Sequence, residues 1–319
     1  MEAYRVDVHH HILPREYVQA LESIGKSESG GSALPEWNVE AALSMMDSQG
    51  IATAVTSISS PGVYFGDINF ARDLARRCNE ISASLIDKYP QRFGALAVLP
   101  LPDVEAALVE IDYALSTLKL DGVILLASYG NEYLGNPLFE EVFAELNRRK
   151  ATVLLHPTTP PGSDVAKLNL PGFIVEFVFD TTRAVANLIY SGALERYPDI
   201  SIIVSHAGGT VPYLVQRFTI ATEIMPQLGE KAPQSAITYL KRLYYDTAIS
   251  TSTPTLRALQ ELVGTTQILF GSDYPYMEQS LIENSISALT GYEGFSENEL
   301  AFIERQNALK LFPQLNYRK

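Results

Sequence analysis

Short runs of β-branched and other apolar residues alternate along the chain with longer segments of helical periodicity. Apolar runs of about four to eight residues, bounded by turn residues, are typical of buried strands. The predicted strands are residues 6–11, 53–58, 93–99, 122–127, 152–156, 201–206, 243–248 and 267–271.

Each of these strands is followed by a predicted helix, which favours the α/β class and a single closed (β/α)8 TIM barrel. An open, doubly wound sheet shares the alternation but expects a glycine-rich loop after the first strand. His9, His10 and His11 stand at that place instead. We therefore predict one barrel domain over residues 1–319, with a C-terminal helix after the last strand.

The ends of several helices can be predicted from capping residues. Asn136 precedes a proline, and Asp103 is expected to cap another helix. The helix that begins near Glu176 is expected to continue as far as Tyr197, where a proline follows.

Two long segments interrupt the regular spacing. Residues 12–38 include a glycine- and serine-rich tract at 25–32, and residues 158–175 are rich in proline and glycine. Both follow strands, so they belong to the C-terminal rim, where barrel enzymes place their substrate loops. Surface decoration without function is the alternative.

Composition limits the class of partner. The chain has 319 residues, of which 24 are Lys or Arg and 37 are Asp or Glu, giving a net charge of −13. This charge repels phosphate backbones and anionic lipid, so we expect neither nucleic-acid nor membrane binding. Cys78 is the only cysteine, and its helical context predicts a buried side chain rather than a nucleophile. With no signal-like start and no long apolar stretch, the sequence predicts a cytoplasmic protein.

All five histidines follow apolar runs at predicted strand ends. Side chains alternate between the two faces of a strand, so His9 and His11 are expected to face one way with Asp7, and His10 the other. A His-x-His pair can place two nitrogens on one ion, each at about 2.0–2.1 Å. We interpret His10 as structural.

Two further strand ends supply candidates for the same ion. His156 ends the fifth predicted strand, and Asp273 follows the eighth, which adjoins the first strand once a barrel closes. His9, His11, His156 and Asp273 therefore predict a metal site of three imidazoles and one carboxylate. Zinc is favoured for this ligand set, and manganese also fits if the substrate chelates the ion.

His206 ends the sixth predicted strand and is the remaining histidine. The predicted ligand set is complete without it, and an imidazole exchanges protons near neutral pH. We therefore predict that His206 is a catalytic acid or base. A ligand role and a supporting role behind the ligands are the alternatives.

Polar motifs recur along the chain in a fixed order: Asp7-Val8-His9-His10-His11-Ile12-Leu13-Pro14, His156-Pro157, Asp180-Thr181-Thr182, Ser205-His206-Ala207-Gly208-Gly209, Gly271-Ser272-Asp273-Tyr274-Pro275 and Asn307-Ala308. Together they resemble the amidohydrolase superfamily, in the branch that contains aminocarboxymuconate semialdehyde decarboxylase and the hydroxybenzoate decarboxylases. The resemblance covers nearly the whole chain. It implies metal ligands at His9, His11, His156 and Asp273, with His206 as the catalytic histidine.

Departures from that branch bear on the substrate. The muconate semialdehyde enzyme, which the chain resembles, uses an arginine near its first helix to hold a substrate carboxylate. In this chain, residues 12–58 contain only Arg15 and Lys26 as cations. Thr158 stands where that enzyme has tryptophan. Both differences argue against a dicarboxylate substrate. Arg217 corresponds to an arginine that reaches in from a neighbouring subunit, which implies a homodimer; an ordinary surface ion pair is the alternative.

The sequence thus predicts an enzyme, a carboxy-lyase that decarboxylates a small aromatic acid such as an ortho-hydroxybenzoate of the methylsalicylate type. The predicted substrate contacts are Arg217, Tyr64, Phe65, Phe177 and Tyr274. Either Asp273 or His206 is expected to deliver a proton to the ring, unless a water deprotonated by His206 adds to the substrate. The alternatives are a metal-dependent hydrolase of a lactone or amide, a hydratase, and a binding protein with a structural metal.

Overall fold

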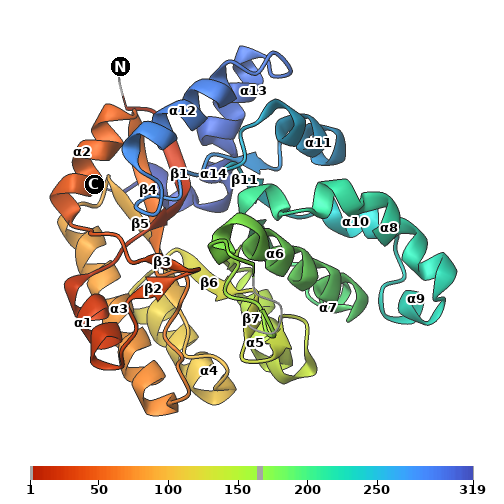
Figure 1. The fold of residues 1–319 in the computed structure, drawn as a ribbon, viewed down its shortest axis with the longest axis horizontal. Helices are drawn as coiled ribbons and strands as arrows, with labels where there is room; N and C mark the ends of the chain where they lie inside the picture. Colours follow the sequence, from red (N-terminus) through yellow and green to blue (C-terminus); the bar gives the residue numbers. More distant parts are fainter. Residues whose placement is uncertain (1–2, 164–167, 319) are drawn as a thin grey trace.

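The computed structural model describes residues 3–163 and 168–318. At its centre, eight strands form a sheet in which each hydrogen-bonded pair of neighbours is parallel (Figure 1). In sheet order the strands are β1 (Arg5–His11), β4 (Ile51–Ser57), β5 (Phe93–Val98), β6 (Gly122–Leu126), β9 (Thr152–His156), β10 (Ser201–Val204), β11 (Tyr244–Asp246) and β12 (Ile268–Leu269). The sheet order follows the chain order, which confirms the predicted (β/α)8 TIM barrel.

Backbone hydrogen bonds from the chain after β12 close the barrel against β1. Val8 N donates to Phe270 O at 3.0 Å, and Asp273 N donates to His9 O at 2.8 Å. The extended residues that follow the short strand β12 therefore take the place of a longer eighth strand. As a result, closure of the barrel itself brings Asp273 beside the histidines of β1.

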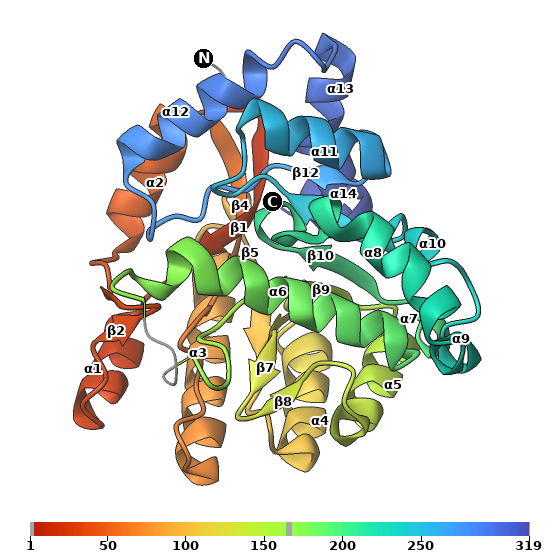
Figure 2. The ribbon, with the colours of Figure 1, turned by 45° about the vertical axis from the view of Figure 1, so that its right-hand side comes forward.

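Helices surround the strands, as Figures 1 and 2 show. They are α1 (Arg15–Ser23), α2 (Val39–Ser48), α3 (Ile68–Lys88), α4 (Val104–Asp112), α5 (Glu140–Arg149), α6 (Gly172–Tyr190), α7 (Ala193–Arg196), α8 (Val211–Ile224), α9 (Gln227–Lys231), α10 (Ala236–Leu240), α11 (Thr253–Val263), α12 (Gln279–Thr290), α13 (Glu297–Ala301) and α14 (Asn307–Leu311). Buried apolar residues of the strands and helices form one core between the two layers. Within the described ranges, no helix has the length and apolar character needed to cross a bilayer.

The predicted strands and caps are confirmed, and the described strands begin and end within two residues of the predicted bounds. Asp103 Oδ1 accepts a hydrogen bond from Ala106 N, and Asn136 Oδ1 accepts one from Leu138 N. The single helix expected from near Glu176 to Tyr197 is wrong. Gly192, with a φ of 80°, separates α6 from the short helix α7, because its left-handed backbone interrupts the helical ladder.

The two predicted rim segments contain regular structure. Residues 12–38 hold α1 and a small hairpin of β2 (Glu28–Ser29) and β3 (Ser32–Ala33). The other segment, 158–175, runs into the first turn of α6, and its residues 164–167 lie outside the described part of the chain. The two segments meet, since the backbone N–H of Phe173 in the first turn of α6 donates to Gly30 O at 3.4 Å.

At the opposite end of the barrel, where the strands begin, an ion pair and a hydrogen bond join the two ends of the chain. Arg5 Nε donates to Glu304 Oε1 at 2.7 Å, and Arg305 Nη1 donates to Tyr4 O at 2.9 Å. In Figures 1 and 2 the N-terminus accordingly lies beside the C-terminal helices. We call this end the foot of the barrel and the opposite end, where the strands finish, the mouth.

Candidate metal centre

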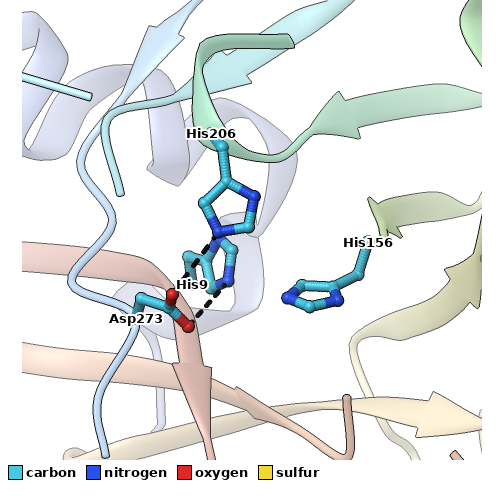
Figure 3. Close-up of side chains that lie close together, drawn as sticks. All are labelled: His9, His156, His206 and Asp273. Atoms are coloured by element: carbon cyan, nitrogen blue, oxygen red, sulfur yellow. Dashed lines mark hydrogen bonds and ion pairs between the residues drawn. The ribbon is translucent and has the colours of Figure 1, made fainter. Parts of the chain in front are cut away.

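Polar side chains from four strand ends converge at the mouth of the barrel. His9 lies in β1, His156 ends β9, His206 follows β10 and Asp273 follows β12. One potential ligand atom of each lies within 4.8 Å of those of the others, and all four residues are buried (Figure 3). Barrel enzymes build their active sites at this end of the strands.

His11 contacts the same group from β1. Its Nε2 lies 3.2 Å from Asp273 Oδ1, and its ring centroid lies 4.8 Å from that of His9 and 5.0 Å from that of His156. The structure therefore brings together all four predicted ligands. The group of four mutually close residues, however, contains His206 in the place of His11.

The three histidines predicted as ligands share one feature: each has a hydrogen bond at Nδ1. The partners are Asp246 Oδ2 for His9 at 2.8 Å, Ser57 Oγ for His11 at 2.9 Å, and Pro157 O for His156 at 2.7 Å. A proton held on Nδ1 leaves the lone pair on Nε2, which is what a metal-binding imidazole needs. Nε2 of His9 and His11 is buried and has no hydrogen-bond partner among the described residues.

His206 differs from these three histidines. Its Nδ1 is buried and has no hydrogen-bond partner within the part of the chain that the structure describes, while its Nε2 lies 3.4 Å from Asp273 Oδ2. His206 and Ala207 both have a φ of 54°, a left-handed conformation that is unfavourable for residues other than glycine. An imidazole with one nitrogen beside a carboxylate and the other without a partner among the described residues is suited to proton transfer.

The buried charges of the site fit a cation. Burial opposes ionisation of Asp273, but the charge of His9 and the close imidazoles of His11 and His206 outweigh it and hold the pKa of the carboxyl well below its ordinary value. Burial also disfavours a charged His9, yet Asp246 and Asp273 raise the pKa of His9 to about 10. Burial lowers the pKa of His11 to about 4 and holds that of His156 well below its ordinary value. A divalent ion suits this pattern. Protonated His9 lies between the carboxylates of Asp246 and Asp273, and the ion can displace its proton on the side of Asp273.

Asp7 does not face the centre with His9 and His11, which corrects the expected alternation. Its Oδ2 lies 3.1 Å from His10 Nδ1, and it also accepts a hydrogen bond from Ser272 Oγ at 2.5 Å. The cause is an irregularity of β1 between Asp7 and His10, where the register against β4 shifts. Asp7 thus ties β1 to the residue before Asp273.

Phe177 is the predicted substrate contact that the structure places against the histidines, with its ring centroid 6.3 Å from that of His156. The ring of Tyr274 packs at 4.9 Å on that of His10, and that of Phe65 at 6.2 Å on that of Phe70. The remaining aromatic, Tyr64, is half-buried against the core. Tyr276, another rim aromatic, has its ring 5.7 Å from that of His11.

Arg217, the predicted cationic contact, lies on α8 and is exposed. Across residues 3–163 and 168–318, no carboxylate is paired with it. The ordinary surface ion pair that was the alternative for Arg217 is therefore not present in the described chain.

Asp246 and Ser57 were not among the predicted site residues, although each anchors a histidine. Asp246 ends β11 and Ser57 ends β4, so both stand at the same end of the sheet as the histidines. Their place after an apolar run was the available signal. Acids and hydroxyls are common at strand ends, however, so residue type alone does not mark these two.

Comparison with known proteins agrees with the geometry of the site. The sequence profile of the family described as Amidohydrolase matches residues 6–314. The chain belongs to the amidohydrolase family. This match confirms the superfamily that the strand-end motifs resemble.

Relatives within the family cover nearly all of the chain. A 6-methylsalicylic acid decarboxylase from Penicillium expansum is 37% identical over 315 residues, which span 98% of this chain and 97% of the relative. A solved structure described as amidohydrolase II is 29% identical, with a TM-score of 0.90 over 97% of this chain and 99% of that one. A dihydroxybenzoic acid decarboxylase from Polaromonas, solved with manganese and 2-nitroresorcinol, has a TM-score of 0.85 and covers 98% of both chains. At 23% identity, this last match shows the fold alone.

Proposed function

We propose that this chain is a metal-dependent carboxy-lyase that removes carbon dioxide from an ortho-hydroxybenzoate, with 6-methylsalicylic acid as the preferred member of the class. One support is the Penicillium expansum relative, which is named for this activity and matches nearly the whole of both chains. The other is the set of convergent imidazoles and a carboxylate at the mouth of the barrel.

The observation that carries the assignment of roles is the contrast at Nδ1. His9, His11 and His156 have that nitrogen anchored, whereas Nδ1 of His206 has no partner among the described residues. We therefore assign His9, His11 and His156, together with Asp273, as metal ligands. His206 is assigned as the proton-transfer group.

A divalent ion held by these ligands would supply a positive centre for the carboxylate and phenolate oxygens of the substrate. Zinc is the ion that we propose, because three imidazoles and one carboxylate suit it well. Manganese, present in the Polaromonas structure, is the alternative. Metal analysis of the purified protein, followed by reactivation of the chelated protein with each ion, separates the two.

Decarboxylation needs one proton at the ring carbon that carries the carboxylate. Once that proton has been added, the carbon–carbon bond breaks, its electron pair restores the aromatic ring, and carbon dioxide leaves. His206 is the donor in this proposal, and the ionised Asp273, 3.4 Å from its Nε2, stabilises the imidazolium form. Asp273 itself is the alternative donor. Phe177 forms an apolar wall beside His156 that the substrate ring can pack against.

Arg217 supports a homodimer whose protomers share their active sites. It is exposed on α8, as are the apolar side chains of Tyr213 and Ile224 on the same helix. Helix α6, which runs beside α8 in Figure 2, has exposed Phe173 and Phe179 side chains. A second copy would cover these apolar groups and bring a guanidinium towards a partner's mouth. Light scattering of wild type and Tyr213→Asp tests this, with a dimer expected only for wild type.

The proposed activity is tested by carbon dioxide release from 6-methylsalicylate, salicylate, 2,6-dihydroxybenzoate and 4-hydroxybenzoate. The last compound is the matched control, because its hydroxyl cannot chelate together with the carboxylate. We expect release from the ortho compounds alone, abolished by a chelator and restored by added metal. Silence across the panel from metal-loaded protein would overturn the proposal and direct attention to lactone and amide hydrolysis.

A further inference from the structure

Asp246 lies between the two kinds of histidine in the site. It ends β11, and its side chain is fully buried. Its Oδ2 lies 2.8 Å from His9 Nδ1. Its Oδ1 accepts hydrogen bonds from the backbone N–H groups of His206 at 2.9 Å and Ala248 at 3.0 Å. One carboxylate thus contacts a predicted metal ligand through one oxygen and the backbone of the predicted catalytic histidine through the other.

We propose that Asp246 is a positioning residue that couples His9 to His206. It fixes the proton of His9 on Nδ1 and holds the left-handed backbone of His206. This inference rests on the proposed roles of His9 as a metal ligand and of His206 as the proton donor. It adds a residue that the strand-end motifs do not include.

The effect of Asp246 on His9 follows from which of the two groups can donate a hydrogen bond. A carboxylate can only accept, so a neighbouring imidazole must present its N–H to Asp246. On a metal-bound His9 the only remaining proton is then at Nδ1, with Nε2 directed to the ion. Nε2 of His9 lies 3.4 Å from Asp273 Oδ1, on the side where the other ligand atoms gather.

The effect of Asp246 on His206 concerns the backbone after β10. His206 and Ala207 have left-handed φ values, a backbone conformation that is unfavourable for residues other than glycine. The hydrogen bond from His206 N to Asp246 Oδ1 is buried and accepted by a charged group, which makes it stronger than a neutral one. It therefore stabilises the conformation that directs the His206 ring towards Asp273.

Asp246→Asn is the sharpest test, because asparagine has the same shape but only one acceptor oxygen. If that oxygen accepts from His206 and Ala248, the amide NH2 faces His9 Nδ1 and forces the proton of His9 onto Nε2. If the amide is turned round, the NH2 faces two backbone N–H donors. The variant can satisfy one side of the coupling and not both.

The experiment measures the dissociation constant for Zn²⁺ by competition with a chromogenic chelator, and kcat at saturating Zn²⁺. For Asp246→Asn we expect zinc affinity to fall roughly 10–100-fold or kcat to fall by a similar factor. For Asp246→Ala, which loses both contacts, we expect both losses together. Asp121→Asn at the foot of the barrel is the matched control and should leave both quantities within about threefold. Wild-type values in both Asp246 variants would overturn the proposal.

A measurement on the wild type keeps the proposal testable if the variants do not fold. With five histidines in the chain, ¹⁵N-histidine labelling gives a small set of imidazole signals. In the zinc-loaded protein, His9 should carry its proton on Nδ1 and the metal on Nε2, and the reverse arrangement would overturn the coupling. Neither zinc affinity nor the tautomer depends on the substrate. Failure of the proposed decarboxylation is thus distinguishable from failure of this inference.

Discussion

Two buried acids, Asp121 at the foot of the barrel and Asp180 at its mouth, have opposite surroundings. At the foot, Asp121 has every oxygen paired: Oδ1 accepts from Gln314 and Arg318, and Oδ2 accepts from Ala95 N and Arg318. At the mouth, Asp180 Oδ2 accepts only from Thr158 N, and Oδ1 has no hydrogen-bond partner among the described residues. Burial accordingly raises the pKa of Asp180 to about 6.

The difference distinguishes charged groups that stabilise the fold, at the foot, from polar groups that are available for the proposed reaction, at the mouth. At the foot, Arg5 pairs with Glu304 and Asp121 pairs with Arg318, and each pair joins distant parts of the chain. At the mouth, Nε2 of His9 and His11 and Nδ1 of His206 are buried without a hydrogen-bond partner in the described ranges. Unpaired buried polar atoms destabilise a protein, so their concentration at one end is best explained by an ion and a substrate that complete them.

The largest effect of a substitution at the mouth is expected at Asp273. Asp273→Asn removes the negative charge that three histidines face, and we expect turnover to fall to the uncatalysed background, with loss of bound metal. Carbon dioxide release and metal content of the purified variant measure this. A variant that retains metal and near-full turnover would contradict both the ligand role of Asp273 and the donor role considered for it.

His206→Asn sharpens the distinction between ligand and proton donor. We expect kcat to fall by roughly 10²–10⁴, the usual contribution of a general acid, while the metal content stays at that of wild type. Steady-state kinetics and metal analysis on the same preparation provide the test. Loss of metal together with activity would move His206 into the ligand set, as its place in the group of four mutually close residues allows.

Asp121→Ala tests the foot of the barrel. It leaves Arg318, which is largely buried, without its partner, so we expect the free energy of unfolding to fall by about 3–5 kcal/mol. At a temperature where the variant is folded, kcat and metal affinity should equal those of wild type. Urea unfolding measures the first quantity, and a change in zinc affinity would show that the two ends are not independent.

Asp180→Asn should have the opposite effect on stability, in a pH-dependent way. The pKa of Asp180 is raised from its ordinary value of 3.8 to about 6 in the folded protein. The folded protein therefore loses stability as the pH rises between these two values. The variant should therefore be more stable than wild type by about 3 kcal/mol at pH 8 and by about half of that at pH 5. Unfolding curves at both pH values check this, and a gain that does not change with pH would exclude titration of Asp180 as the cause.

Much of the cluster at the mouth could be predicted because the proposed ligands stand at fixed places in a local pattern. His156 and Asp273 each follow an apolar strand, and parallel strands of a barrel deliver such residues to one end. The alternation that placed Asp7 beside His9 failed, since an irregularity in β1 depends on its neighbour β4. Asp246 was missed because its importance lies in a contact with His9, 237 residues away in the chain.

By itself the sequence determined the alternation of strands and helices, the barrel and the residues at its mouth. These follow from apolar periodicity and strand-end position, which are local properties of the chain. Only the tertiary structure decided which nitrogen of each histidine is available. The partners of Nδ1 of His9 and His11 come from other strands, Asp246 in β11 and Ser57 in β4, and hydrogen bonds between distant segments exist only once the barrel has closed.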